Sequence, residues 1–337
     1  MVISKTPYRI SFFGGGTDYP EWYRKEGGAV LSTTIDKYCY LSCRFLPPFF
    51  NIKHRIVWSH VETVSSISEI LHPVVREGLP FLGFDDSVGL EIHHQGDLPA
   101  RAGIGSSSSF VVGLIKALTA LQGMSIRKHE LALRAIELEQ NVMKENVGSQ
   151  DQVAAAYGGF NVIHFLPSGD IEVKPVDIPA SRLLDLQSHL LLFYTGTSRL
   201  GPEVAKGIIE KLGSKQAELD EIRRMVDRGL SILSGNGCMD SFGRLLHEGW
   251  ALKRELSPAV TSQAVDKIYK IAMEHGALGG KLLGAGSAGF MVFYVPLEKQ
   301  KHVIDALSGY LHVPFKFENE GSSLIYDGSN DSASFVK

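Results

Sequence analysis

The strongest local signal in the sequence is Leu98-Pro99-Ala100-Arg101-Ala102-Gly103-Ile104-Gly105-Ser106-Ser107-Ser108-Ser109, which leads into the apolar segment 110–121. This segment is long enough to form a buried helix. Small residues let backbone N–H groups converge, and the helix N-terminus adds the positive end of its dipole, so the stretch predicts a phosphate-binding site. The Gly-x-x-x-x-Gly-Lys-Ser/Thr pattern of a Walker A loop is absent. A serine N-cap on a buried helix is the alternative explanation.

The composition is that of an ordinary globular chain. Of its 337 residues, 44% are hydrophobic and 21% are charged, which excludes a disordered chain and favours two domains. The 34 Lys and Arg residues nearly balance the 37 Asp and Glu residues, which gives a formal net charge of −3. Such a small charge supplies no general field for nucleic acid or for an acidic membrane. Composition alone therefore leaves a soluble enzyme or a binding protein.

The cysteines and the N-terminus indicate a reducing compartment. The cysteines are too few, and odd in number, for a disulfide framework: Cys39, Cys43 and Cys238. The first residues lack the apolar segment of a signal peptide, and no apolar run reaches the roughly 18 residues of a membrane span. We therefore expect a cytoplasmic protein that has neither nucleic acid nor a membrane as its partner.

Strand-like and helix-like segments alternate, which predicts an α+β fold. Up to residue 180, we expect strands at 29–45, 52–61, 90–94, 160–165 and 171–176, and helices at 110–121, 129–145 and 152–157. After a polar stretch at 179–188 we expect a strand at 189–195, four helices between residues 202 and 275, and strands at 289–295, 313–317 and 323–326. We place two α+β domains at residues 1–180 and 181–337.

A carboxylate stands on the apolar face of the helix expected over 129–145. The residues three and four positions from Glu139 are all apolar: Ala135, Ile136, Val142 and Met143. An unpaired carboxylate on a buried face is costly, so Glu139 needs a cation, and Mg²⁺ is a natural one beside phosphates. A buried pair with Arg or Lys is the alternative.

Two further acidic residues stand in loops. Asp151 enters a short helix of small residues, where it serves either as an N-cap or as a general base aimed into a cleft. Asp18 follows Gly14-Gly15-Gly16 and a strand in which Arg9 lies on the face opposite Tyr8. Asp18 is suited to bind vicinal hydroxyls, and an Asx turn with a surface arginine is the alternative.

Gly284-Ala285-Gly286-Ser287-Ala288-Gly289 matches the Gly-x-Gly-x-x-Gly dinucleotide fingerprint. That fingerprint has to follow a strand and open a helix. Here the helix expected at 258–275 precedes it and a strand follows, so we reject a Rossmann fold. A glycine loop is left, which either lines an active site or only joins a helix to a strand.

Three motifs together resemble those of the GHMP small-molecule kinases, the family of galactokinase, homoserine kinase, mevalonate kinase and phosphomevalonate kinase. They follow the order of the family over nearly the whole chain: Pro7–Tyr19, Gly103–Ser108 and Lys281–Gly289. Glu139 also precedes Asp151 by twelve residues, much like the metal-binding Glu and catalytic Asp of galactokinases.

Four segments look characteristic of one branch of the family, the bacterial D-glycero-D-manno-heptose 7-phosphate kinases: Ser4–Arg9, Gly14–Asp18, Gly148–Gln152 and Tyr194–Arg199. Galactokinases carry Glu-His where this chain has Gly15-Gly16, so the resemblance disfavours galactose. Mevalonate kinases have lysine in place of Arg9, and the phosphate motif usually ends in alanine where Ser108 and Ser109 stand. These departures affect the substrate and leave the phosphate and metal roles in place.

The resemblance implies a ribosomal protein S5 domain 2-like N-terminal domain and a ferredoxin-like C-terminal domain, with the site between them. It implies ATP and Mg²⁺ as cofactors, with the ATP phosphates on Gly103, Ile104, Gly105, Ser106, Ser107 and Ser108, and the metal at Ser107 and Glu139. Asp151 would accept the proton of the attacking hydroxyl, and Arg9 would orient Asp151 or offset charge on the transferring phosphoryl group. The substrate residues would be Gly16, Thr17, Asp18, Arg199, Gly284 and Gly286.

The reaction that the resemblance implies is transfer of phosphate from ATP to the anomeric hydroxyl of D-glycero-D-manno-heptose 7-phosphate, giving the 1,7-bisphosphate for nucleotide-activated heptose and surface glycans. The cations considered for the substrate phosphate are Arg199, Lys5, Arg101 and Lys281. Two alternatives stay open: a kinase for an unphosphorylated sugar such as fucose, arabinose or another hexose, and a non-catalytic sensor of sugar or nucleotide. The sequence leaves open whether the chain forms a homodimer.

Overall fold

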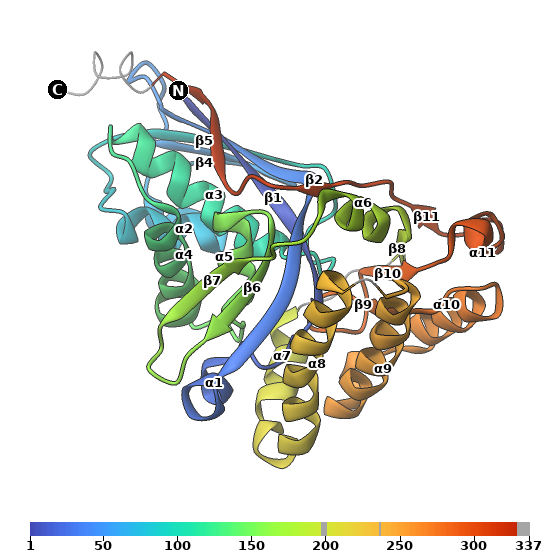
Figure 1. Ribbon diagram of the computed structural model, residues 1–337. Coiled ribbons are helices and arrows are strands. Elements are labelled where there is room, and N and C mark those ends of the chain that lie inside the picture. The colour runs from blue at the N-terminus through green and yellow to red at the C-terminus, as the bar shows by residue number, and fades with distance from the viewer. Residues whose placement is uncertain (197–200, 236, 329–337) are drawn as a thin grey trace.

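Two β-sheets and the helices around them make up the computed structural model, which describes residues 1–196, 201–235 and 237–328 (Figure 1). Within these residues the large sheet has nine strands and the small sheet has four. The two sheets share one continuous hydrophobic core. This mixture of helices and sheets is the α+β class that the sequence predicted.

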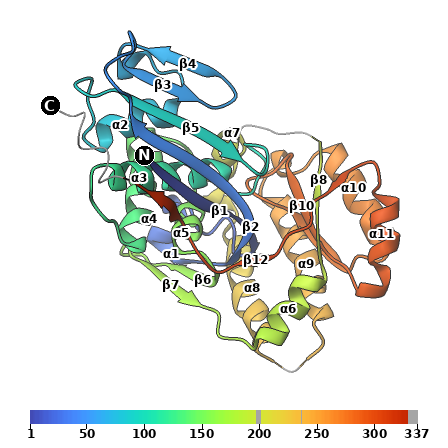
Figure 2. The same ribbon diagram turned by 90° about the horizontal axis from the view of Figure 1, so that it is seen from above.

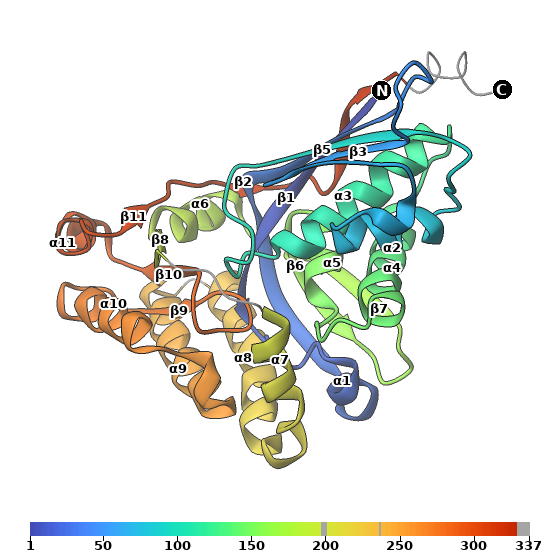
Figure 3. The same cartoon turned by 180° about the vertical axis from the view of Figure 1, so that it is seen from behind.

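Strand β2 (Gly28–Phe45) organises the large sheet, because different neighbours pair with different parts of its length. β1 (Val2–Phe13) lies antiparallel beside nearly all of it. On the other side, β6 (Phe160–Phe165) pairs with the beginning of β2 and β5 (Leu90–Gly96) pairs with its end. The result is a long, curved strand at the centre of the molecule, visible from behind in Figure 3.

A hairpin lies at one edge of the large sheet, where the sequence predicted one strand over 52–61. β3 (His54–Val57) runs parallel to β5, and β4 (Val61–Val64) turns back beside it. The prediction of a single strand is wrong because the N–H of Trp58 donates to the carbonyl of His60 at 2.9 Å and closes a turn there.

Helices α2, α3, α4 and α5 cover one face of the large sheet (Figure 1). They span Pro73–Phe81, Ser106–Leu121, Lys128–Ile136 and Gln150–Tyr157. α3 packs directly on β1 and β2 and is buried on most sides, as its continuous apolar sequence predicted. It begins at Ser106 rather than at residue 110, so the serines form its first turn.

The small sheet has the strand order β11-β8-β10-β9, with antiparallel pairs throughout the described residues. Its strands span Leu311–His312, Leu190–Tyr194, Phe290–Tyr294 and Gly279–Leu282. α9 (Asp240–Leu256) packs on β9 and β10, and Figure 2 shows this layer beside the large sheet. Phe242 of α9 contacts Phe12 and Phe13 of β1, with ring centroids 5.3 and 5.0 Å apart, which joins the two sheets.

The end of the chain returns to the large sheet. β12 (Phe317–Glu318) pairs with β2, and β13 (Ser323–Asp327) pairs with β1 on the side that β2 leaves free. We expected residues 181–337 to form the second domain, but these two strands lie in the first sheet. There β13 supplies hydrogen-bonding partners to an edge of β1 that would otherwise be open.

Two further segments also differ from the prediction. The helix expected over 129–145 changes after α4 into a π-helical turn, Glu137–Val142. The polar stretch 179–188 forms a helix, α6 (Ala180–Ser188). The other elements are α1 (Pro20–Glu26), β7 (Ile171–Pro175), α7 (Gly201–Ile209), α8 (Gln216–Ser234), α10 (Gln263–Glu274) and α11 (Gln300–Ala306). None of the described helices is both long and apolar enough to cross a bilayer.

Candidate active site

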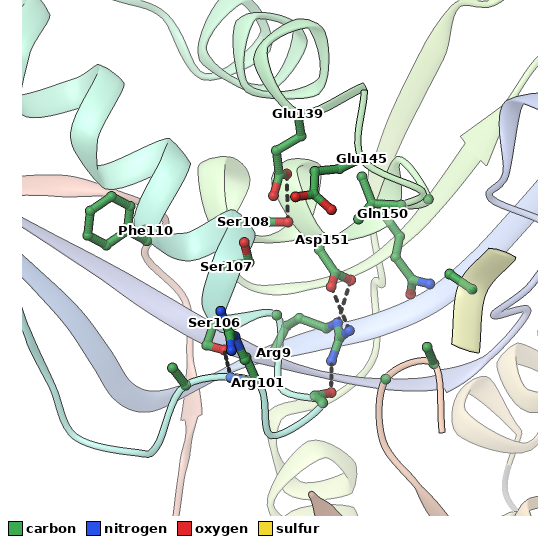
Figure 4. A pocket seen from close by; sticks show the side chains of 18 of the residues that line it. Arg9, Arg101, Ser106, Ser107, Ser108, Phe110, Glu139, Glu145, Gln150 and Asp151 are labelled. Carbon is green, nitrogen blue, oxygen red and sulfur yellow. Dashed lines mark hydrogen bonds and ion pairs between the residues drawn. The ribbon is translucent and has the colours of Figure 1, made fainter. Parts of the chain in front are cut away.

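A large cavity lies where the two sheets meet. Its volume is about 860 Å³, which is the size of a site for small molecules. Its wall comes from β1, the loop before α3, the start of α5, helix α9 and the glycine loop 284–289. Figure 4 shows the centre of the cavity, where labelled side chains of β1, of the segment that leads into α3 and of the start of α5 converge. All three glycine motifs of the sequence contribute to this wall.

The loop before α3 and the first turn of that helix, residues 103–108, have the backbone of an anion site, and we refer to this segment as the phosphate loop. Gly103 and Gly105 have φ angles of 79° and 74°, which favour glycine. A Cβ atom on Gly103 would lie 2.3 Å from the carbonyl oxygen of Leu283, so only glycine allows this contact with the chain before the glycine loop. α3 begins at Ser106 with its N-terminus at the cavity, where its dipole favours an anion.

The residues of the phosphate loop divide between the cavity and the interior. Ser106 and Ser107 line the cavity. Ser108 also reaches it, but its hydroxyl donates to the carboxylate of Glu139 at 2.8 Å. Ile104, which the resemblance placed against ATP, does not line the cavity because its side chain is fully buried in the core. Ser106 and Ser107 therefore both offer a hydroxyl to a bound ligand, and that of Ser106 also accepts the N–H of Arg101 at 3.0 Å.

Arg9 and Asp151 form a bidentate ion pair beside the phosphate loop (Figure 4). Arg9 Nε and one terminal nitrogen donate to the two carboxylate oxygens of Asp151 at 2.7 and 2.8 Å. The other terminal nitrogen of Arg9 donates to the carbonyl of Gly103 at 2.7 Å. Arg9 is only 3% exposed, so it is no surface arginine. One guanidinium thus sets both the orientation of Asp151 and its position relative to the phosphate loop.

Glu139 lies inside the protein, as its apolar neighbours predicted. It is 1% exposed and sits on the π-helical turn, a feature that is frequent at functional sites. Its carboxylate accepts hydrogen bonds from Ser108 and from the amide of Gln152. Burial raises its pKa to about 7, although these hydrogen bonds act in the opposite direction. Among the described residues, no Arg or Lys forms an ion pair with Glu139. A cation that balances its charge would therefore have to be a bound ion.

The surroundings of Glu139 fit Mg²⁺. Mg²⁺ prefers oxygen ligands and is usually held by one or two carboxylates together with substrate phosphates. Glu139 supplies a carboxylate that lines the cavity, and Ser107 supplies a hydroxyl close enough to influence its ionisation. Within the described part of the chain, no group of three or more His, Cys, Asp or Glu residues forms a complete metal site. A metal here would take its remaining ligands from a phosphate and from water.

Asp18 also lines the cavity. It is 2% exposed, and its carboxylate accepts the N–H of Gly16 at 2.9 Å. Burial raises its pKa, and the nearby charge of Asp151 adds to this effect. A Cβ atom on Gly148 would lie 1.9 Å from its Oδ2, so the chain keeps a glycine there. Thr17 does not line the cavity because it is fully buried; its hydroxyl donates to the carbonyl of Gly14 in the same turn and to that of Ala29 in β2.

The other predicted substrate residues have mixed outcomes. Gly16, Gly284 and Gly286 line the cavity. Arg199 lies outside the described residues. Lys5 does not line the cavity; its ammonium group lies over the ring of Tyr38.

The glycine loop also differs from its expected setting. β9 (Gly279–Leu282) precedes it and β10 follows, so the loop joins two antiparallel strands. The sequence did not predict β9, yet the rejection of a dinucleotide fingerprint holds because no helix follows the loop.

Two groups of cavity residues were missed by the sequence reasoning. The first is Lys253 of α9, for which two of the four neighbours three and four positions away are large and apolar, Trp250 and Leu256; this is a weaker form of the signal that found Glu139. The second is an aromatic end of the cavity, where His72 stacks on Phe110 with centroids 4.5 Å apart. Burial lowers the pKa of His72 to about 4, so its ring is uncharged at neutral pH, and the two stacked rings suit a flat ring as ligand.

Comparisons with known proteins agree with this arrangement. Residues 69–159 match the family described as GHMP kinases N terminal domain, and residues 230–312 match GHMP kinases C terminal. A D-glycero-alpha-D-manno-heptose 7-phosphate kinase of Campylobacter jejuni is 28% identical over 95% of this chain and 97% of its own length. A bifunctional fucokinase/GDP-fucose pyrophosphorylase of Arabidopsis thaliana is 27% identical over 93% of this chain and 32% of its own length.

A solved structure extends the similarity to the fold. It is a D-glycero-D-manno-heptose 1-phosphate kinase from Bacteroides thetaiotaomicron, with a TM-score of 0.77 and 25% identity. The match covers 97% of this chain and 99% of that one. Both parts of the chain, and the cavity between them, therefore fall within the aligned region.

Proposed function

Because the chain belongs to the GHMP kinase family and is an ATP-dependent sugar kinase, we propose that it phosphorylates the anomeric hydroxyl of D-glycero-D-manno-heptose 7-phosphate and produces the 1,7-bisphosphate. The observation that carries this proposal is the ion pair of Arg9 and Asp151 between the phosphate loop and Asp18. This ion pair supports a role for the Asp151 carboxylate beside an acceptor hydroxyl and the phosphoryl group that it attacks. The names of the heptose phosphate kinases similar to this chain support the choice of sugar.

In the proposed reaction, the anomeric oxygen attacks the γ-phosphorus of ATP while the bond from this phosphorus to the bridging oxygen of ADP breaks. Asp151 accepts the proton of the hydroxyl. Arg9 keeps both oxygens of Asp151 in place before transfer and still bonds to one of them afterwards. Phosphoryl transfer needs mainly positioning and stabilisation of charge, and the buried guanidinium and the N-terminus of α3 provide both.

We propose Ser107 and Glu139 as the protein ligands of Mg²⁺. The metal would neutralise charge on the ATP phosphates when it is bound. The hydrogen bonds from Ser108 and Gln152 hold the carboxylate of Glu139 toward the cavity and favour its ionised form. Gly103, Gly105 and the first turn of α3 would hold the phosphates through backbone N–H groups.

A kinase for an unphosphorylated sugar is the second candidate, and the similarity to a fucokinase favours it. A panel of acceptors decides between the two: ADP release is measured with heptose 7-phosphate, the same heptose without phosphate, fucose, arabinose and mannose. We expect turnover only with the 7-phosphate. Turnover confined to unphosphorylated sugars would overturn the proposed acceptor.

We place this reaction in the cytoplasm. ATP is available there, and the described cysteines Cys39, Cys43 and Cys238 are free thiols, which suits a reducing compartment. Cell fractionation with an antibody against the chain tests this assignment, and recovery from an oxidising compartment would contradict it.

A further inference from the structure

Two lysines from the second half of the chain reach into the cavity. Lys281 on β9 is 8% exposed, and its Nζ donates to the carbonyl of Phe12 at 2.8 Å. Lys253 on α9 is partly buried, and its Nζ donates to the carbonyls of Leu282 and Gly284. Both line the cavity that holds Arg9 and Asp151.

Neither of these two side chains has a carboxylate within ion-pair distance in the part of the chain that the structure describes. Their hydrogen bonds run to neutral carbonyl groups. Burial lowers the pKa of Lys253 to about 8 and that of Lys281 well below its usual value. The positive charge of Arg9 adds to both effects, and that of Lys253 adds to the effect on Lys281, whereas the carboxylate of Asp18 opposes both. A buried charge without a partner is costly, so an anion would be stabilised here.

The lysines stand at the sugar end of the cavity. They face a second, small pocket together with Gly14 and Gly15, and the charge of Asp18 acts on both. The aromatic end around Phe110 lies across the serines of the phosphate loop from Gln150, as Figure 4 shows. The anion that meets the lysines therefore belongs to the acceptor, because ATP is accommodated by the phosphate loop and the aromatic end.

We propose that Lys253 and Lys281 bind the phosphate group that the sugar carries before the reaction and so select sugar phosphates over free sugars. An ammonium group has three N–H donors, and the bonds described above leave two on Lys281 and one on Lys253. Phosphate oxygens are acceptors for donors of this kind. The inference rests on the proposed function in one respect, namely that the acceptor is a sugar bound next to Asp18.

The competing explanation is that each lysine has only a structural role and links neighbouring segments through its hydrogen bonds to their carbonyl groups. Calorimetric titration separates the two, using the full chain with heptose 7-phosphate and with the same heptose lacking phosphate. The wild type should bind the phosphorylated sugar about a hundredfold more tightly, and Lys253→Met and Lys281→Met should each reduce this preference about tenfold or more. Affinity for a non-hydrolysable ATP analogue should stay the same.

Three further variants sharpen the result. Lys270→Met removes a lysine that is paired with Glu274 on the surface of α10 and should leave the preference unchanged. Lys253→Gln and Lys281→Gln keep an N–H donor for the carbonyl partners and remove the charge, and they decide the question if the methionine variants do not fold. Equal weakening of both sugars, or a preference retained in the glutamine variants, would overturn the lysine site.

The outcomes also separate this inference from the proposed function. If heptose 7-phosphate is no substrate but a hexose 6-phosphate binds with the same dependence on the lysines, the proposed acceptor is wrong and the lysine site stands. If every lysine variant phosphorylates heptose 7-phosphate with the KM of the wild type, the acceptor is right and the lysine site is wrong. A wild type that binds both sugars equally would also overturn the site.

Discussion

Replacement of Asp151 by asparagine tests the centre of the proposed mechanism. The substitution keeps the shape of the side chain and removes both its charge and its ability to accept a proton. In the structure, Asp151 has two bonds of 2.7 and 2.8 Å to Arg9, whose side chain is 4% exposed. The change therefore acts on catalysis and on stability, and the two effects can be measured separately.

The stability effect follows from the ion pair. Loss of one partner of a buried pair costs about 3–5 kcal/mol, because the other charge is left without compensation. The side chain of Asp151 is 25% exposed, and asparagine still accepts one hydrogen bond, so we expect about 3 kcal/mol for Asp151→Asn. Arg9→Met should restore part of this loss in the double variant, because it removes the uncompensated guanidinium.

The catalytic effect should be larger. Loss of a general base lowers turnover about 10²–10⁴-fold, and it should lower kcat more than it raises the KM for ATP. ADP release by Asp151→Asn is measured under saturating substrate, and urea unfolding of the same preparation shows the folded fraction. Turnover within about threefold of the wild type, in a fully folded variant, would remove Asp151 from the role of base.

Three further predictions concern the metal and the sugar. Glu139→Gln should raise the Mg²⁺ concentration for half-maximal turnover about tenfold or more, and an unchanged requirement would make Glu139 a structural residue. Burial raises the pKa of Glu139 from 4.5 to about 7, so between these pH values the folded chain holds a proton that the unfolded chain has lost. The free energy of unfolding without metal should therefore fall by about 3 kcal/mol as the pH rises from 4.5 past 7. Urea titration measures this fall, which should be absent in Glu139→Gln. Gly148→Ala puts a Cβ 1.9 Å from Asp18 Oδ2 and should raise the KM for the sugar about ten- to hundredfold with the KM for ATP unchanged. Gly309→Ala is its control, since a Cβ there meets nothing within 4 Å, and equal effects of the two changes on KM would contradict the role of Asp18.

The sequence predicted those features that depend on local pattern. The inward direction of Glu139 followed from its four apolar neighbours, and the buried helix α3 followed from an unbroken apolar run. The hairpin of β3 and β4 was missed because the turn at Trp58 and His60 carries no Gly, Pro or Asn to mark it. The pairing of β13 with β1 was missed for a different reason, since local periodicity holds no information on which distant strand is the neighbour.

The site itself depends on contacts that no single motif contains. Lys253 holds the carbonyl of Gly284, and a Cβ on Gly284 would lie 2.5 Å from the Cα of Gly103, so these two loops meet without side chains between them. Arg9 then joins the carbonyl of Gly103 to Asp151. These contacts explain why glycine recurs in motifs far apart in the sequence. The two loops approach this closely only because Gly103 and Gly284 lack a Cβ, and Arg9 and Lys253 then each bind the carbonyl of one of these glycines. A nearly neutral protein can in this way concentrate positive charge at one place and still need no excess of basic residues overall.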